Sequence, residues 1–157
     1  MPKELKVFHF WEKNPSKTTN KHTLSLFFSN SLFTVHAGFY GAWESVSTAA
    51  LQSVRSLANK YPSYSIFVTG HSLGAAICSL AAVDIVGLLG LPVTVYNYGQ
   101  PRVGNDEWVS YYGSMVNTTW RIVNEDDIVP HLPPQLLNFE HVTIESWYND
   151  GDFTICS

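Results

Sequence analysis

The feature that most constrains this sequence is a five-residue turn, Gly70-His71-Ser72-Leu73-Gly74, which matches the pattern G-x-S-x-G. It follows a short apolar stretch at residues 65–69 and opens a run of small apolar residues at 75–89. Three fixed positions in five recur by chance, so the flanking segments decide the value of the match. Here they predict a strand, a sharp turn and a helix, which is the setting that places such a serine at an exposed bend.

The composition of this turn indicates a specific chemistry. Its two glycines lack the Cβ atoms that would clash where the chain bends sharply. The hydroxyl of Ser72 would be exposed, and the N–H of Leu73 could donate to an oxyanion that develops during acyl transfer. We therefore predict a serine nucleophile at position 72 and an oxyanion donor at position 73. The alternative is an ordinary turn in which the serine only caps the helix.

The rest of the chain alternates between strand and helix patterns. Apolar residues spaced three and four apart predict a helix that follows Phe39 and ends at Pro62. Strands are predicted at 24–28, 93–98, 118–123 and 139–148, and a short helix at 106–112. Because strands that alternate with helices form β-α-β units, we expect an α/β protein with a mostly parallel sheet and flanking helices.

A serine nucleophile also needs a base that takes its proton and a carboxylate that orients this base. In folds with this turn, the acid and then the histidine follow the serine along the chain. The predicted strand at 118–123 runs into Asn124-Glu125-Asp126-Asp127, where the carboxyl end of a strand would place acidic groups at the site. Asp127 directly precedes an Ile-Val-Pro turn and is our candidate, while Glu125 and Asp126 remain alternatives.

Composition narrows the classes of function. The chain has 157 residues, of which 45% are apolar and 14% charged, as expected for one domain with a hydrophobic core. The net charge is -4 and there is no basic stripe, so we expect no nucleic-acid partner. We also expect no transmembrane segment, because no apolar run reaches ~18 residues. The start of the sequence shows no secretory-signal pattern, and the compartment stays undetermined.

Four stretches extend the pattern beyond the turn. They are residues 35–39, 68–76, 98–104 and 121–134, which read VHAGF, VTGHSLGAA, YGQPRVG and RIVNEDDIVPHLPP. In this order and spacing they resemble the class 3 lipases, the fungal type within the α/β-hydrolases. The resemblance implies an α/β-hydrolase core that is incomplete, with residues 1–32 as an unmatched N-terminal segment and 33–157 as a partial lipase-like domain.

The resemblance also implies an activity. Members of this family are carboxylic ester hydrolases that act on acylglycerol lipids with a Ser–Asp–His triad, and they use neither a metal nor an organic cofactor. Carried over by position, Ser72 is the nucleophile and Asp127 is the triad acid. The expected partners are a lipid ester substrate and a lipid–water interface.

Two parts of the family pattern are missing. The triad histidine of the family lies in an Asp-His-x-x-Tyr-Phe-like stretch, and only His131 and His141 follow Asp127 here. By position His131 matches the Pro-His-Leu-Pro-Pro turn, which leaves His141 as a substitute candidate. The Arg-Gly turn that supplies a second oxyanion donor is absent from residues 1–32. We expect an incomplete lipase domain, and the alternative is an impaired relative that serves as a lipid-binding or interaction module.

Overall fold

The structure is a computed structural model that describes residues 6–9, 23–28 and 31–156, with side chains from residue 33 onward. Our interpretation of residues 1–32 therefore falls mostly outside the described residues. Two strands within that range are described, β1 (Lys6–His9) and β2 (Thr23–Phe28). The second confirms the strand predicted at 24–28.

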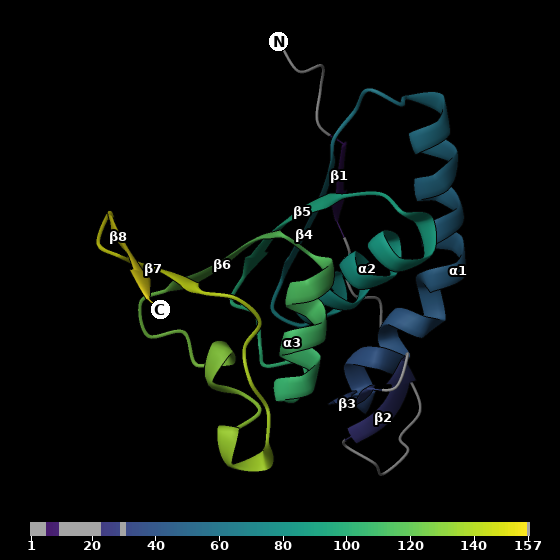
Figure 1. Ribbon diagram of the computed structural model, residues 1–157. Coiled ribbons are helices and arrows are strands. Elements are labelled where there is room, and N and C mark those ends of the chain that lie inside the picture. The colour runs from purple at the N-terminus through teal and green to yellow at the C-terminus, as the bar shows by residue number, and fades with distance from the viewer. Residues whose placement is uncertain (1–5, 10–22, 29–30, 157) are drawn as a thin grey trace.

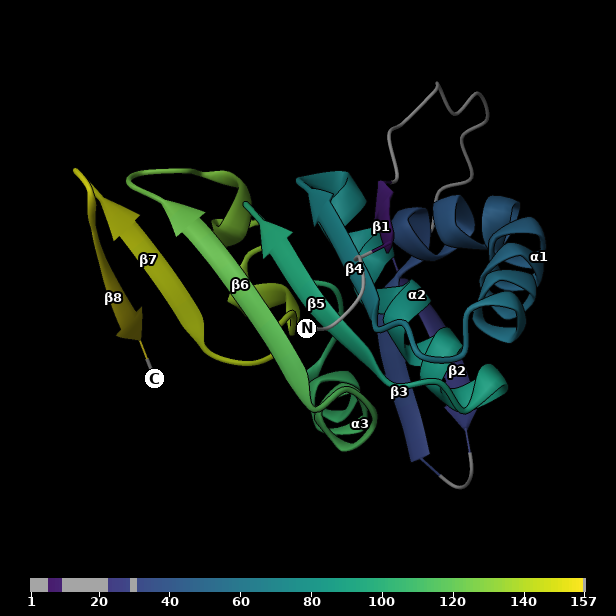
Figure 2. The ribbon, with the colours of Figure 1, turned by 90° about the horizontal axis from the view of Figure 1, so that it is seen from above.

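A six-stranded sheet forms the centre of the described structure (Figure 1). Besides β1, its strands are β4 (Ile66–His71), β5 (Val93–Tyr98), β6 (Thr118–Asn124), β7 (Glu145–Asn149) and β8 (Asp152–Cys156). Figure 2 shows them in the order β1-β4-β5-β6-β7-β8 across the sheet. Neighbours run parallel from β1 to β7, and β8 returns antiparallel to β7. The mostly parallel α/β sheet that we predicted is confirmed.

The described residues form three α-helices, α1 (Ala37–Lys60), α2 (Leu73–Leu89) and α3 (Asp106–Met115). Helix α2 contacts both β4 and β5, while α1 and α3 pack against α2. A second, two-stranded sheet joins β2 to β3 (Ser31–His36), and β3 contacts α3. Helix α2 therefore lies between the sheet and the other helices, so the core of the described structure forms around it.

The sequence of α2 explains its central place. Ten of its 17 residues are buried, among them Ala75, Ala76 and Ile85. A helix with apolar residues on nearly every side is stable only when most of it is enclosed, and only the end of α2 around Leu88 is exposed. It ends at Gly90, whose φ of 66° is the left-handed conformation that commonly terminates helices.

The predicted strand at 139–148 is wrong over its first half. Strand β7 begins only at Glu145, and the preceding segment is irregular although Phe139 and Val142 are buried. Thr143 has a φ of 57°, a left-handed conformation that an extended strand does not contain. The two buried residues of this segment are three positions apart and Ile144 is 49% exposed, so burial does not alternate as the predicted strand required.

Strand β8 was not predicted, although the sequence contains its signal. Asp150 and Gly151 connect β7 to β8, and both have positive φ, 47° and 92°. An Asp-Gly pair in this conformation is typical of a tight β-hairpin turn. The prediction ended the last strand at residue 148, before this turn, and so missed the hairpin.

Candidate active site

Of the five residues predicted as a turn at 70–74, only Ser72 lies outside regular structure. Strand β4 ends at His71 and helix α2 begins at Leu73. The backbone of Ser72 has φ 54° and ψ −125°, which residues other than glycine rarely adopt. Its N–H donates to the carbonyl of Tyr98 at 3.0 Å, and its own carbonyl accepts from Ala75 N at 3.0 Å. Its side chain makes no capping hydrogen bond, so the alternative of a capping serine finds no support.

Glycine is required on the strand side of this turn. A Cβ at Gly70 would lie 2.7 Å from the backbone nitrogen of Ala75 and would overlap the carbonyl of Gly74. Both atoms belong to the backbone of the first turn of α2 and cannot move aside independently. The close approach of strand and helix therefore depends on the missing side chain, as the sequence indicated.

The N–H of Leu73 is the first of helix α2. The first N–H groups of a helix have no acceptor within the helix. Within the described part of the chain, that of Leu73 has no other acceptor either. It lies next to Ser72 at the positive end of the helix dipole, which favours a developing negative charge.

A buried polar network lies beneath the turn. The Asn97 side-chain amide donates to the Ala75 carbonyl at 3.0 Å and to Gln100 Oε1 at 2.8 Å. It also lies 3.3 Å from Ser79 Oγ. Asn97, Gln100 and Ser79 are fully buried, so these bonds tie the first turn of α2 to β5 in a dry environment. We did not predict this network, although polar residues inside an apolar strand and an apolar helix were a visible signal.

Asp127 follows β6 and lies beside the end of β5. Its Oδ1 accepts from Val129 N at 3.0 Å, which fixes the carboxylate. Its Oδ2 is 2.5 Å from the point where a Cβ at Gly99 would be, so only glycine leaves room for it there. The alternatives Glu125 and Asp126 are both exposed.

The candidate residues lie at one edge of the sheet. Ser72, Gly99 and Asp127 follow three adjacent parallel strands, β4, β5 and β6, whose carboxyl ends share that edge. Neighbouring strands are about 4.8 Å apart, so β4 and β6 are separated by about 10 Å. Glycine occupies the middle position at residue 99. At this strand spacing no direct hydrogen bond between serine and carboxylate is expected, and His71 Nε2 lies 3.7 Å from the point where a Cβ at Gly99 would be.

His141, the substitute candidate for the base, has another partner. Its Nε2 lies 2.7 Å from the carbonyl of Pro130. Burial, assisted by the positive charge of Arg121, lowers the pKa of His141 to about 3. The imidazole is therefore neutral and donates through Nε2. Within the described residues, no histidine hydrogen-bonds to Ser72 or Asp127.

Arg102 connects two of the four sequence stretches, 98–104 and 121–134, through hydrogen bonds. Its Nη1 donates to the carbonyls of His131 at 2.6 Å and Pro133 at 2.9 Å, and its backbone N–H donates to Leu132 O at 2.8 Å. The stretch at 98–104 thereby holds the loop that follows Asp127. The role of Arg102 in these bonds is structural.

Comparisons with known proteins agree with this geometry. The family described as Lipase (class 3) matches residues 6–137. The secreted mono- and diacylglycerol lipase 1 of Fusarium solani is 36% identical over 125 residues, which are 77% of this chain and 37% of that protein. A lipase of Rhizomucor miehei is 41% identical over 121 residues, 74% of this chain and 33% of that protein.

Solved structures that resemble this chain are also lipases. The lipase from Rhizopus microsporus var. chinensis superposes with a TM-score of 0.79 at 34% identity, over 85% of this chain and 49% of that one. The chain spans about a third of the length of these curated relatives and about half of that solved chain. The matched residues contain the serine turn and the Asp127 loop, and the chain belongs to the class 3 lipase family of the α/β-hydrolases.

Proposed function

We propose that this chain carries the nucleophile and the acid of a serine hydrolase that cleaves lipid esters, acylglycerols among them. The main observation is the strained backbone of Ser72, held between Tyr98 and α2 at the edge of the sheet that also carries Asp127. Support for the substrate class comes from relatives named mono- and diacylglycerol lipases. One solved relative, 38% identical, is described as a triacylglycerol lipase with a serine protease triad.

The proposed reaction is a two-step acyl transfer. Ser72 Oγ attacks the ester carbonyl while a histidine takes its proton, and Asp127 orients that histidine. The Leu73 N–H stabilises the oxyanion, and the histidine returns the proton to the departing alcohol. Water then attacks the acyl-serine ester and releases the fatty acid. The base is a histidine other than those of residues 33–156.

The test is ester hydrolysis by the 157-residue chain and by the longest polypeptide that contains it. Substrates are p-nitrophenyl butyrate and palmitate. We expect Ser72→Ala to abolish turnover, and Asp127→Asn to lower kcat by about 10⁴. Asp126→Asn is the matched control, because it removes an exposed carboxylate from the same turn and should leave kcat unchanged. Full turnover in Ser72→Ala would exclude the proposed nucleophile.

A second candidate function is lipid binding without turnover. It is favoured by the absence, within the described residues, of any histidine bonded to Ser72 or Asp127. No helix among the described residues is long and apolar enough to cross a membrane. Sedimentation with lipid vesicles, together with no esterase activity in the longest polypeptide, would select this function.

A further inference from the structure

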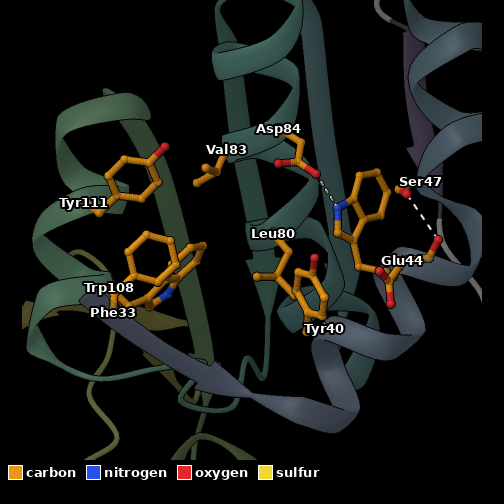
Figure 3. Close-up of a pocket in the computed structure, with 10 residues that line it drawn as sticks. Phe33, Tyr40, Glu44, Ser47, Leu80, Val83, Asp84, Trp108 and Tyr111 are labelled. Atoms are coloured by element: carbon orange, nitrogen blue, oxygen red, sulfur yellow. Dashed lines mark hydrogen bonds between the residues drawn. The ribbon is translucent and has the colours of Figure 1, made fainter. Parts of the chain in front are cut away.

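A separate pocket of about 170 Å³ lies among the three helices and β3 (Figure 3). Helix α1 contributes Tyr40 and Trp43, and α3 contributes Trp108 and Tyr111. Asp84 of α2 reaches the same space. It is twelve residues beyond Ser72, or about 18 Å along the helix, so the pocket is distinct from the candidate active site.

Negative charge is concentrated at this pocket. Asp84 Oδ2 accepts from Trp43 Nε1 at 2.7 Å, and Glu44 also lines the space. Burial raises the pKa of Asp84. Burial, together with the charges of Glu44 and Asp84, raises the pKa of Tyr40. None of the described residues that line the pocket is a lysine, an arginine or a histidine. A partly buried carboxylate without a cation is costly, so the pocket favours a positively charged guest.

Aromatic rings surround this charge. Figure 3 shows Tyr40 on one side, Phe33, Trp108 and Tyr111 on the other, and Asp84 between them. Phe33 stacks on Tyr111 with 4.9 Å between ring centroids, which fixes that wall. The faces of aromatic rings attract cations, and several rings beside a carboxylate are typical of sites for quaternary ammonium groups.

The size of the pocket and its donor set narrow the ligand further. An engineered cavity of about 150 Å³ is large enough to bind benzene, so this pocket accepts a group of similar size. A divalent metal ion would need several oxygen ligands. Within the described residues, no group of three or more His, Cys, Asp or Glu side chains could hold one. An organic cation therefore fits better than an inorganic one.

We propose that this pocket binds a quaternary ammonium group, with Tyr40 and Tyr111 contacting its methyl groups and Asp84 balancing its charge. The group could belong to free choline or to the headgroup of a choline lipid. The inference is independent of the chemistry at Ser72.

The test is calorimetric titration of the Ser72→Ala protein with choline, at constant ionic strength. The uncharged isostere 3,3-dimethylbutanol is the control ligand. We expect choline to bind at least about tenfold more tightly than the isostere, because the isostere lacks the charge that rings and carboxylate attract. Equal affinity for the two ligands, or no binding of choline, would overturn the proposal.

Two variants locate the site. Asp84→Asn keeps an acceptor for Trp43 but removes the charge, and it should weaken choline binding about tenfold. Asp106→Asn is the matched control, since Asp106 is exposed at the start of α3, and it should bind as the parent does. If Asp84→Asn unfolds, Tyr111→Leu tests the aromatic wall instead. Choline affinity unchanged in a folded Asp84→Asn or Tyr111→Leu protein would refute the site.

Vesicles distinguish the two sources of the ligand. Sedimentation with phosphatidylcholine but not phosphatidylglycerol vesicles, reduced by Asp84→Asn, assigns the pocket to a lipid headgroup. Binding of choline in solution without vesicle binding assigns it to the free cation. Because the parent protein here is Ser72→Ala, either result stands apart from the outcome of the esterase test.

Discussion

The elbow unit, which we define as β4, α2 and β5, and the C-terminal hairpin of β7 and β8 belong to one sheet but differ in burial. Ten of the 17 residues of α2 are buried, whereas no residue of β7 or β8 is. Phe153 and Ile155 of β8 are 69% and 51% exposed. The hairpin is held by strand pairing with β6 and by the ion pair of Arg121 with Glu145. In the elbow unit, the residues that stabilise the fold therefore also fix the geometry of the site. In the hairpin, few residues contribute to either.

The largest effect expected from this comparison comes from removing the same side chain in each region. Ile85 of α2 is 3% exposed and Ile155 of β8 is 51% exposed. Ile85→Ala should lower the free energy of unfolding by about 3–4 kcal/mol, because it leaves a cavity. Ile155→Ala should change it by less than about 0.5 kcal/mol. Urea denaturation measures both, and equal losses would show that the hairpin is as firmly packed as the elbow unit.

A smaller effect should follow from adding one methyl group to the elbow unit. Gly70→Ala should cost about 2–3 kcal/mol, because the new Cβ meets backbone atoms of Gly74 and Ala75. Gly41→Ala is the control, since nothing lies within 4 Å of a Cβ there and the site is inside α1. It should stabilise the protein by about 0.5–1 kcal/mol. A neutral Gly70→Ala would mean that strand and helix can separate without loss.

A pH-dependent effect is expected from His141, which lies in the sequence between the two regions. Its pKa is about 3 in the folded chain, so the unfolded chain binds a proton first as the pH falls below about 6.5. Stability should therefore fall from pH 6.5 towards pH 3, by at most about 1.4 kcal/mol per pH unit for this one proton. His141→Gln should remove this part of the slope. Denaturation of both proteins from pH 7 to 4 measures it, and parallel curves would contradict the assigned burial.

The smallest effect concerns Ser72 itself. Ser72→Gly should be about 1 kcal/mol more stable than Ser72→Ala, because glycine adopts a φ of 54° without strain and alanine does not. Both variants should lack esterase activity, so thermal denaturation is the measurement. If the two variants unfold at the same temperature, the backbone of residue 72 is not strained. The elbow unit would then differ from the hairpin in burial alone.

The elbow unit could be predicted from sequence because its signals are local. The strand, the serine turn and the helix follow one another, and Asp127 comes three residues after the end of β6. The hydrogen bond between Trp43 and Asp84 joins residues 41 positions apart, and the network of Asn97 depends on where α2 packs. Neither leaves a periodic pattern in the sequence, since both are products of tertiary packing. The segment at 139–144 misled for a different reason: its sequence alternates in polarity, but only Phe139 and Val142 are buried there, as anchors of a loop.

The mostly apolar sequence of α2 has a consequence for synthesis of the chain. When Leu89 has been made, α1 and β4 already exist, but β5 and α3 do not. The ribosome must continue to Met115 before every helix that packs against α2 is present, which takes on the order of seconds at typical translation rates of about 5–20 residues per second. During that interval an apolar helix has only part of its cover, so the nascent chain is a candidate client for chaperones at this point.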